Sequence, residues 1–377
     1  MAGVPKRVAV VFGTRPEAIK LAPVVWALRK RSHAFRVELL KSGQHRELLE
    51  PMLGQLDLAP DVDLSSMAPG EPLAEIAARC LSGIARVLAE RRPELVLVQG
   101  DTTTALAAAL AAFYAGIPVG HVEAGLRSGS LEEPFPEELN RRVIDSLARW
   151  LFAPTRRAAE RLEQEGIAGE RVFVTGNTVV DALEGVRRRL DRILARDGAG
   201  STNERPLVLV TCHRRESFGL RLEQICRAVV RLAASHPGHR FVWPLHKNPN
   251  VEASVRALAG KEPNLELSPP LDYERFLLLL SRAELVLTDS GGVQEEAPSF
   301  GVPALVLRER LDRPESVELG WAVACGVSEQ RIVEEATRLL ATPRPAQNPE
   351  NPYGDGRAGE RIAEILEREL SGRGGQE

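Results

Sequence analysis

Cysteine is scarce in this chain of 377 residues, and its placement excludes two kinds of site. The four cysteines, Cys80, Cys212, Cys226 and Cys325, are scattered, with no C-x-x-C pair and no histidine cluster beside them. We therefore expect neither a zinc site nor a disulfide framework, and no metal in the function. A reducing cytoplasm is the simplest setting for such a chain.

Long hydrophobic runs and an excess of one charge are also missing. The N-terminus, MAGVPKRVAVVFGT, lacks the apolar core and the cleavage site of a secretory signal. The longest apolar stretch, TALAAALAAFYAGIPVG, contains Gly116 and Pro118, which favours a buried helix running into a strand over a membrane span. The net charge of −3 gives no electrostatic case for nucleic acid or an anionic membrane. We expect a soluble cytoplasmic protein whose partners include neither.

The glycine-rich fingerprints of nucleotide binding are the third absence. No G-x-G-x-x-G follows a predicted strand, and no G-x-x-x-x-G-K-[ST] occurs in the chain. These absences argue against the dinucleotide fingerprint and the P-loop, and we expect no redox cofactor. Binding of nucleotide phosphates without either motif would be typical of a nucleotide-sugar enzyme.

Short apolar runs alternate with longer helical patterns, which predicts an α/β fold. Because the short runs are continuously apolar, both faces of each strand are buried, as in parallel sheets. The predicted strands are 7–12, 35–40, 94–99 and 117–122 in the first half and 206–211, 240–245, 284–289 and 303–307 in the second. The helical patterns at 21–31 and 75–92 are long enough for crossover connections.

A change of composition at residues 186–206 indicates a joint between two doubly wound parallel-sheet domains. There a basic helix gives way to a segment rich in Gly, Ser and Asn, although the hinge can also lie earlier, near TGNTVVD. We place the domains at 1–178 and 179–359. Ligands of open parallel sheets bind beyond the carboxyl ends of the strands, so candidate site residues are those that directly follow a strand.

The segment GTRPEAIKLAP follows the first predicted strand and combines a turn, a helix start and two cations. Gly13 permits a tight turn, Pro16 can open a helix, and Arg15 and Lys20 carry positive charge beside it. Backbone N–H groups at a helix N-terminus, together with two cations, form a phosphate site. An ordinary strand-to-helix turn with basic surface residues would give the same pattern.

The segment LVLTDSGGVQEEAPSFGVPALVL is more informative. Its strand ends at Asp289, and Ser290, Gly291 and Gly292 lead into a short helix that carries Glu296. Adjacent glycines let the backbone approach an anion closely, and the serine adds a hydroxyl donor. A glutamate one turn into the helix can accept from a ribose diol. The alternative is a plain glycine-rich turn whose acids are favoured by the helix dipole.

Histidines follow two strands of the second half. His213 stands directly after a strand in VTCHRRESFG, next to Arg214 and Arg215. A lone histidine is usually structural, but at this strand end its imidazole can hold a diphosphate. His246, in PLHKNPN, has the same placement with fewer charged neighbours.

Carboxylates follow two strands of the first half. Asp101 comes after a fully apolar strand and before an alanine-rich helix, where a helix N-cap is the ordinary explanation. Glu123 follows the next strand and does not stand at a recognisable helix start. Glu123 is therefore harder to explain by helix structure alone.

Two further acids, Glu137 and Glu138, open a helix after a proline. They face Arg141 and Arg142 at i+4, and this pairing explains both acids without catalysis.

A collinear set of segments resembles the non-hydrolysing UDP-N-acetylglucosamine 2-epimerases of bacteria. The set runs through VFGTRPEAIKLAP, SGQHRELL, QGDTTT, HVEAGLRSG, PFPEELNRR, VTGNTVVDAL, HRRESFG, PLHKNPNV, TDSGGVQEEAPSFGVP, RPESVELG and NPYGDG, and it spans nearly the whole chain. Each segment alone is weakly specific, whereas the probability that the whole ordered set agrees by chance is very small.

The resemblance implies two Rossmann-like domains of glycosyltransferase-B architecture facing a cleft that holds the active site. It implies that the final helix, within 360–377, packs back on the first domain. The implied activity is interconversion of UDP-GlcNAc and UDP-ManNAc by a homodimer, for polysaccharides of the cell envelope.

The resemblance also assigns roles by position. Asp101, Glu123 and Glu137 match the catalytic acids, and His213 belongs to the same centre. The positions that match contacts with UDP and its phosphates are Arg15, Lys20, His213, Ser290, Gly291, Gly292 and Arg313. Glu296 matches the ribose ligand, and Phe276 matches a residue that lines the uracil pocket.

Chemistry favours elimination as the route. The proton on carbon 2 of the sugar is not next to a carbonyl, so either carbon 3 is oxidised transiently or UDP leaves as the proton departs. Without a redox fingerprint, elimination to a 2-acetamidoglucal is expected, and its two faces need two proton carriers. Three alternatives remain open: a hydrolysing epimerase that releases ManNAc, an epimerase for a modified UDP-diacetamido sugar, and a glycosyltransferase of the same fold.

Some members of the family are activated by UDP-GlcNAc in a neighbouring pocket, which corresponds here to Gln44, Arg214 and His246. Position 47 is Glu where such members have Gln, and the segment DLSSMAPGE lacks their arginine. We therefore expect near-hyperbolic kinetics.

Overall fold

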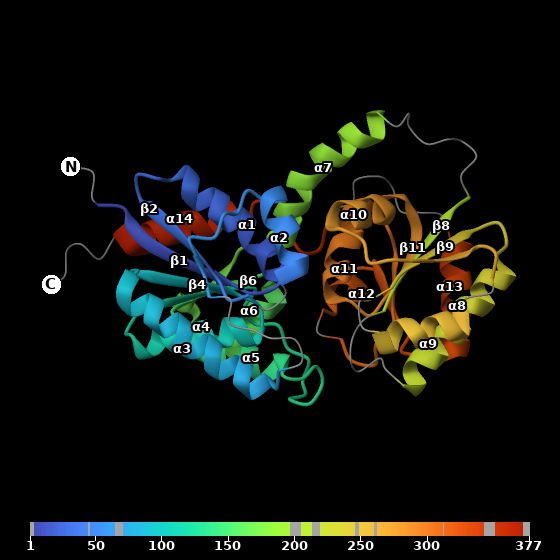
Figure 1. Cartoon of the computed structure of the whole chain (residues 1–377), viewed down its shortest axis with the longest axis horizontal. Helices are drawn as coiled ribbons and strands as arrows, with labels where there is room; N and C mark the ends of the chain where they lie inside the picture. The colour runs from blue at the N-terminus through green and yellow to red at the C-terminus, as the bar shows by residue number, and fades with distance from the viewer. Residues whose placement is uncertain are drawn as a thin grey trace. The chain divides into compact units, whose positions relative to one another are not determined.

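The chain forms two compact units, each built on a parallel sheet covered by helices (Figure 1). A computed structural model describes residues 4–43, 46–64, 71–196, 205–212, 219–245, 249–259, 262–311, 313–342 and 351–371. Unit 1 comprises Met1–Ala182 and Tyr353–Glu377, and unit 2 comprises Leu183–Pro352. The predicted fold class, two parallel-sheet α/β domains, is confirmed.

Unit 1 contains a sheet of seven parallel strands in the order β3-β2-β1-β4-β5-β6-β7. The strands are β1 Lys6–Phe12, β2 Phe35–Lys41, β3 Val62–Asp63, β4 Leu95–Gln99, β5 Val119–Val122, β6 Trp150–Ala153 and β7 Val172–Val174. Strands β2 and β3 are added on one side of β1, and strands β4 to β7 are added on its other side. This reversal places the ligand-binding edge at the carboxyl ends of β1 and β4.

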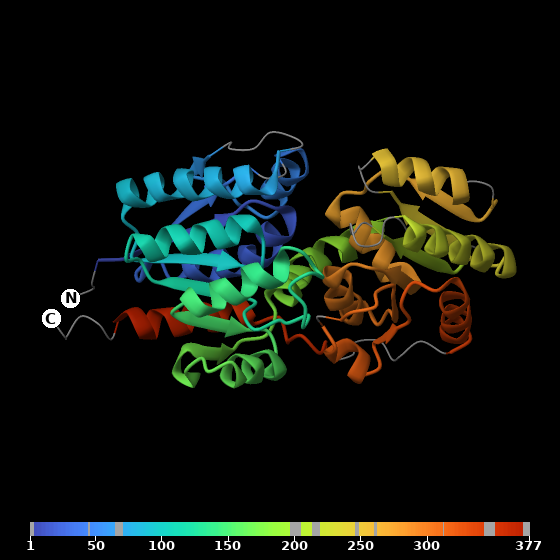
Figure 2. The ribbon, with the colours of Figure 1, turned by 90° about the horizontal axis from the view of Figure 1, so that it is seen from below.

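Helices cover both faces of this sheet. They are α1 Arg15–Lys30, α2 Arg46–Gln55, α3 Leu73–Arg91, α4 Thr103–Tyr114, α5 Glu137–Leu147, α6 Arg156–Gln164, α7 Thr178–Arg196, which continues into unit 2, and α14 Ala358–Ser371, with a 3₁₀ turn at Gly169–Arg171. Helices α3, α4 and α5 lie side by side (Figure 2). The alanines of α4 are buried against the core of the sheet, so small side chains let this helix approach closely.

Helix α14 packs against α1, and the close contact is made by the start of α14. Gly359 is needed there, because a Cβ atom would lie 2.7 Å from the carbonyl oxygen of Pro23. The Asp181 carboxylate accepts from the backbone N–H groups of Ala358 and Gly359, at 3.2 and 2.8 Å, and so caps the first turn of α14.

Unit 2 repeats the same topology with six parallel strands in the order β10-β9-β8-β11-β12-β13. The strands are β8 Leu207–Thr211, β9 Arg240–Pro244, β10 Leu265–Ser268, β11 Ala283–Thr288, β12 Ala304–Val306 and β13 Ala322–Ala324. The helices are α8 Leu220–Ser235, α9 Pro249–Ala259, α10 Tyr273–Arg282, α11 Gly291–Glu296, α12 Glu315–Glu318 and α13 Glu329–Leu340, with a 3₁₀ turn at Ala297–Phe300. The reversal falls between β8 and β11, whose carboxyl ends form the second candidate edge.

All eight strands predicted from the sequence are present, with ends shifted by one or two residues. Five further strands, β3, β6, β7, β10 and β13, have only two to four residues each. Length alone does not explain why these were missed, because β5 and β12 have four and three residues and were predicted.

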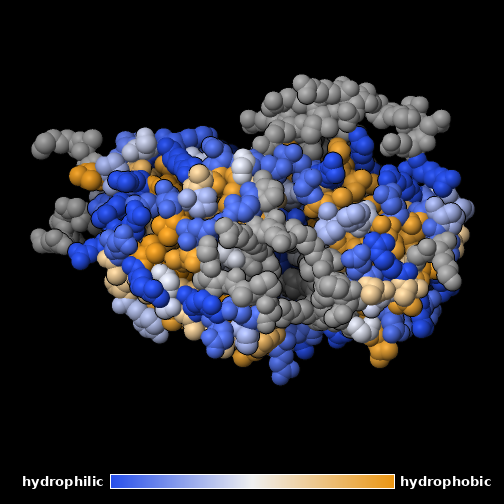
Figure 3. Space-filling model, viewed as in Figure 1, coloured by the Kyte–Doolittle hydropathy of each residue, from blue (hydrophilic) through white to orange (hydrophobic). Residues whose placement is uncertain are grey.

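The surface is of mixed polarity. On the face shown in Figure 3, hydrophilic and hydrophobic residues are intermingled over both units. Among the residues that the structure describes, no helix is both long enough and apolar enough to cross a bilayer.

Candidate active site

The turn between β1 and α1 is built around the buried carboxylate of Glu17. Thr14 caps α1, and Glu17 accepts from the Thr14 backbone N–H at 2.7 Å and from the Thr14 hydroxyl at 2.7 Å. The Thr102 hydroxyl donates to the same carboxylate at 2.7 Å, which ties this turn to the turn after β4. Burial raises the pKa of Glu17, although these hydrogen bonds oppose the shift. Gly13 is a position of close packing, since a Cβ atom there would lie 2.2 Å from Ser42 Oγ.

Lys20 and Glu123, both predicted as site residues, form a buried ion pair. The Gln99 side-chain amide donates to the same Glu123 carboxylate at 2.8 Å, so the acid is held from α1 and from β4. Glu123 also has a positive φ of 70°, which side chains other than glycine rarely adopt. Strained backbone of this kind persists where the surrounding contacts over-determine it, and it is common at functional sites.

Asp101 follows β4 as predicted, but the N-cap explanation for it is wrong. The residue that caps α4 is Thr102, whose hydroxyl accepts from the Ala105 backbone N–H at 3.0 Å. The Asp101 carboxylate instead forms an ion pair with Arg141, and its side chain is 26% exposed. An aspartate that does not serve the adjoining helix is available for another role.

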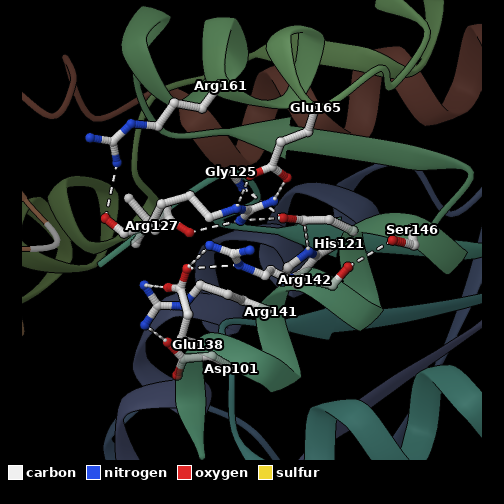
Figure 4. Close-up of polar contacts among 12 residues, drawn as sticks. Asp101, His121, Gly125, Arg127, Glu138, Arg141, Arg142, Ser146, Arg161 and Glu165 are labelled. Carbon is white, nitrogen blue, oxygen red and sulfur yellow. Dashed lines mark hydrogen bonds and ion pairs between the residues drawn. The ribbon is translucent and has the colours of Figure 1, made fainter. Parts of the chain in front are cut away.

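The two acids at the start of α5 are placed differently. Glu138 is fully buried, pairs with Arg142 at 2.9 Å as predicted, and accepts from the Ser128 backbone N–H at 2.9 Å. It therefore anchors the preceding loop, which the sequence pattern did not indicate. Glu137 is half-buried at the first position of the helix, one turn before Arg141. Figure 4 shows Arg141 between Glu138 and Asp101.

A second charged cluster adjoins these residues and escapes the sequence analysis (Figure 4). His121 Nδ1 lies 2.7 Å from Asp145 Oδ1, and Arg127 donates to Asp145 Oδ2 at 2.7 Å and to Glu165 at 2.6 Å. Burial alone would raise the pKa of Asp145, but the His121 ring and the Arg127 guanidinium hold it below its ordinary value. The signal was weak, because Asp145 lies in the last turn of a helix, 24 residues after His121.

In unit 2, hydroxyl and thiol groups connect the ends of β8 and β11. Thr211 and Thr288 share a hydrogen bond of 2.6 Å between their hydroxyls, and Cys212 Sγ donates to the fully buried Asp289 at 3.3 Å. The Ser290 backbone N–H donates to Thr288 Oγ1 at 3.0 Å, and Ser290 stands at the N-cap of α11.

Arg313 lies over the start of α11, which accounts for Gly291. A Cβ atom on Gly291 would lie 2.5 Å from Arg313 Nη1, so a glycine lets the guanidinium pack on the helix. Arg313 is buried and pairs with Glu295. For Gly292, a Cβ atom would meet only Ser290 Oγ, at 3.9 Å. Packing therefore requires the first glycine and not the second.

Glu296 has a partner that the sequence analysis missed. The Tyr273 hydroxyl, from the first position of α10, donates to Glu296 Oε1 at 2.8 Å, and both side chains are buried. Phe276 is half-buried one turn further along the same helix. Tyr273 of α10 thus orients the Glu296 carboxylate.

Four predicted positions, His213, Arg214, His246 and Gln44, lie outside the described residues. Within the described ranges, no group of three or more His, Cys, Asp and Glu side chains is arranged to hold a metal ion.

Comparisons with known proteins agree on one family. The family model described as UDP-N-acetylglucosamine 2-epimerase matches residues 27–367. The UDP-N-acetylglucosamine 2-epimerase of Escherichia coli (strain K12) is 47% identical over 372 residues, which are 96% of this chain and 98% of that protein. The corresponding protein of Campylobacter jejuni is 43% identical over 96% of this chain and 97% of its own length.

Solved structures give the same result for the fold. The crystal structure of UDP-GlcNAc 2-epimerase from Neisseria meningitidis bound to UDP-GlcNAc is 42% identical, with a TM-score of 0.91, over 96% of this chain and all of that one. The Methanocaldococcus jannaschii enzyme in complex with UDP-GlcNAc and UDP is 33% identical, with a TM-score of 0.85, over 96% of this chain and 99% of that one. The expected glycosyltransferase-B-like fold is thus confirmed, and the chain belongs to the UDP-N-acetylglucosamine 2-epimerase family.

Proposed function

We propose that this epimerase interconverts UDP-GlcNAc and UDP-ManNAc without consuming water, by elimination and re-addition of UDP. A base removes the proton on carbon 2, the C–H electron pair forms the double bond between carbons 1 and 2, and UDP leaves with the electron pair of its bond to carbon 1. The 2-acetamidoglucal is then protonated on the opposite face of carbon 2 while UDP adds back to carbon 1. The proton leaves from one face of carbon 2 and a proton is added on the other face, so the site needs two proton carriers.

The observation that carries this proposal is the presence of two carboxylates, each held by a cation, after neighbouring strands of unit 1. Glu123 after β5 pairs with Lys20, and Asp101 after β4 pairs with Arg141. We assign proton transfer at carbon 2 to these acids, with Glu137 as a third candidate from α5. The pairs hold each carboxylate in one orientation, as proton transfer in a fixed geometry requires.

In this proposal unit 2 supplies contacts for the nucleotide. The buried Arg313 and the turn through Ser290 and Gly291 are suited to the diphosphate, because they combine a fixed cation with close backbone approach. Glu296 would accept from the ribose hydroxyls and Phe276 would lie against the uracil. The remaining proposed UDP contacts are Arg15, Lys20, Gly292 and His213.

Exchange in heavy water tests the proposal. The protein is incubated with UDP-GlcNAc in heavy water and the sugars are followed by NMR. We expect UDP-ManNAc to form and both sugars to carry deuterium at carbon 2. Accumulation of free ManNAc and UDP would instead make the enzyme a hydrolysing epimerase. Absence of exchange at carbon 2 would remove both forms of the epimerase reaction and leave transfer of the sugar as the alternative.

The proposal extends to a homodimer in the cytoplasm with near-hyperbolic kinetics. Sedimentation equilibrium of the purified protein measures its oligomeric state. Initial rates at increasing UDP-GlcNAc concentrations measure the kinetics. A clearly sigmoidal curve would contradict the proposal that the substrate is not an activator.

A further inference from the structure

The turn that carries Asp101 is held from three directions by side chains of β5 and α5. His121 Nε2 lies 2.8 Å from the carbonyl oxygen of Gly100, and Asn140 Nδ2 donates to the carbonyl oxygen of Asp101 at 2.8 Å. Arg141 forms an ion pair with the Asp101 carboxylate. Three donors thus converge on two consecutive residues, Gly100 and Asp101.

These contacts hold the backbone on both sides of the Asp101 Cα atom. The Gly100 carbonyl belongs to the peptide plane before this atom, and the Asp101 carbonyl belongs to the plane after it. Because each peptide unit is planar, fixing both carbonyls fixes φ and ψ of Asp101. Gly100 has no side chain to restrict its backbone, and its φ is 69°. The orientation of its carbonyl group therefore depends on the hydrogen bond from His121.

His121 itself is buried between two acceptors. Its side chain has no exposed surface, with Nδ1 at 2.7 Å from the Asp145 carboxylate and Nε2 at the Gly100 carbonyl. The Gly100 carbonyl oxygen can only accept, so Nε2 carries the proton of this hydrogen bond. The Asp145 carboxylate, itself held by Arg127, fixes the other side of the ring.

We propose that His121 is a positioning residue for Asp101, whose Nε2–H fixes the Gly100 peptide plane and does not touch the sugar. The proposal rests on the proposed function of Asp101 in proton transfer. Its physical basis is that misplacement of a catalytic group by about 1 Å can cost about 10²-fold in rate.

Two substitutions at His121 separate its two hydrogen bonds. The amide nitrogen of His121→Gln can take the place of Nε2 and keep the donor to Gly100, whereas that of His121→Asn can take the place of Nδ1 and keep only the donor to Asp145. We expect His121→Asn to lower kcat by about 10- to 100-fold with KM for UDP-GlcNAc within about twofold. We expect His121→Gln to keep kcat within about fivefold. Equal kcat for the two variants would overturn the positioning role.

Combination with Asp101→Asn decides whether His121 acts through Asp101. If it does, His121→Asn should cost less than about twofold in kcat in the Asp101→Asn background, because positioning a residue that cannot transfer the proton has no effect. Additive losses, with Asp101→Asn alone impaired, would overturn the proposal and leave the proposed function intact. Full turnover of Asp101→Asn would overturn the positioning role and remove Asp101 from the catalytic set, and it would leave the epimerase reaction itself standing.

Asn140→Asp tests the same mechanism on the second peptide plane, should His121→Asn fail to fold. It replaces the donor to the Asp101 carbonyl by an acceptor, and the same loss of kcat and the same lack of additivity are expected. Asn264→Ala is the matched control. Asn264 is a buried asparagine of unit 2 that also donates to backbone carbonyls, at 3.0 Å to Ala233 and 3.0 Å to His239. This control should lower the melting temperature and leave kcat unchanged, and a comparable loss of kcat in it would mean that the assay reports stability.

Discussion

The two units share one strand order, yet their polar groups at the carboxyl ends of the strands differ in kind. Unit 1 gathers carboxylates that are paired with cations, as in Lys20 with Glu123 and Arg141 with Asp101. Unit 2 gathers glycine, hydroxyl groups and the Arg313–Glu295 pair around a short helix, with the buried carboxylates of Asp289 and Glu296 beside them. Topology thus sets where a site lies, and the residues after each strand decide whether it suits proton transfer or anion binding.

The largest expected effect comes from removing the acids of unit 1. Asp101→Asn, Glu123→Gln and Glu137→Gln should each lower kcat by at least about 10²-fold, because a general acid or base contributes about that much. If the contrast between the units holds, the dissociation constant for UDP, measured by calorimetry, should change by less than about threefold. A variant with near-full turnover removes its residue from the catalytic set.

Gly291→Ala addresses the anion site of unit 2. The new methyl group would displace the Arg313 guanidinium, which a glycine now lets approach the helix. We expect UDP to bind about tenfold more weakly, since one charge-assisted contact is worth about 1.5–3 kcal/mol. Gly238→Ala is the control in the same unit, because its methyl group would meet no atom within 4 Å. Equal losses in the two variants would show that the Arg313 contact is not responsible.

Tyr273→Phe should have a smaller effect on the same side of the comparison. It removes the hydroxyl that donates to Glu296 and leaves the aromatic ring in place. A hydrogen bond is worth about 1 kcal/mol, so KM should rise by about fivefold with kcat nearly unchanged. A fall in kcat without a change in KM would place this tyrosine in the chemical step and weaken the division of labour between the units.

Asp181→Asn concerns stability and has the smallest expected effect. Burial raises the pKa of Asp181 to about 6, although the N–H groups of Gly359 and Ala358 oppose the shift. A raised folded-state pKa means that the fold binds this proton more tightly than the unfolded chain. The stability gained from that proton is complete below about pH 4, the ordinary range of an aspartate, and is lost as the pH rises through about 6.

The measurement is the melting temperature of both proteins between pH 4 and 8. The wild-type protein should lose stability relative to Asp181→Asn as the pH rises toward 7, by a few degrees. Asp145, whose pKa is lowered, acts in the opposite sense as the pH falls, and the difference between the two proteins removes its contribution. A difference that does not vary with pH would contradict the raised pKa.

What the sequence could and could not predict follows from the range of its patterns. Asp101 and Glu123 were found because a post-strand position is visible from apolar periodicity alone. Asp145 and Tyr273 were missed because a polar residue near the end or at the start of an amphipathic helix looks like part of its solvated face. Their importance comes from partners 24 and 23 residues away in the chain, brought near only by the packing of helices on the sheet.

The packing of α14 on α1 makes unit 1 discontinuous in the chain, with all of unit 2 between its two parts. A ribosome delivers the protein from the N-terminus, and domains generally fold as units while synthesis continues. The sheet of unit 1 is therefore complete early, but the face of α1 that receives α14 stays uncovered until α14 has been synthesised. Unit 2, although it begins later, is the first of the two whose sequence is complete, so the second unit to be translated can finish folding first.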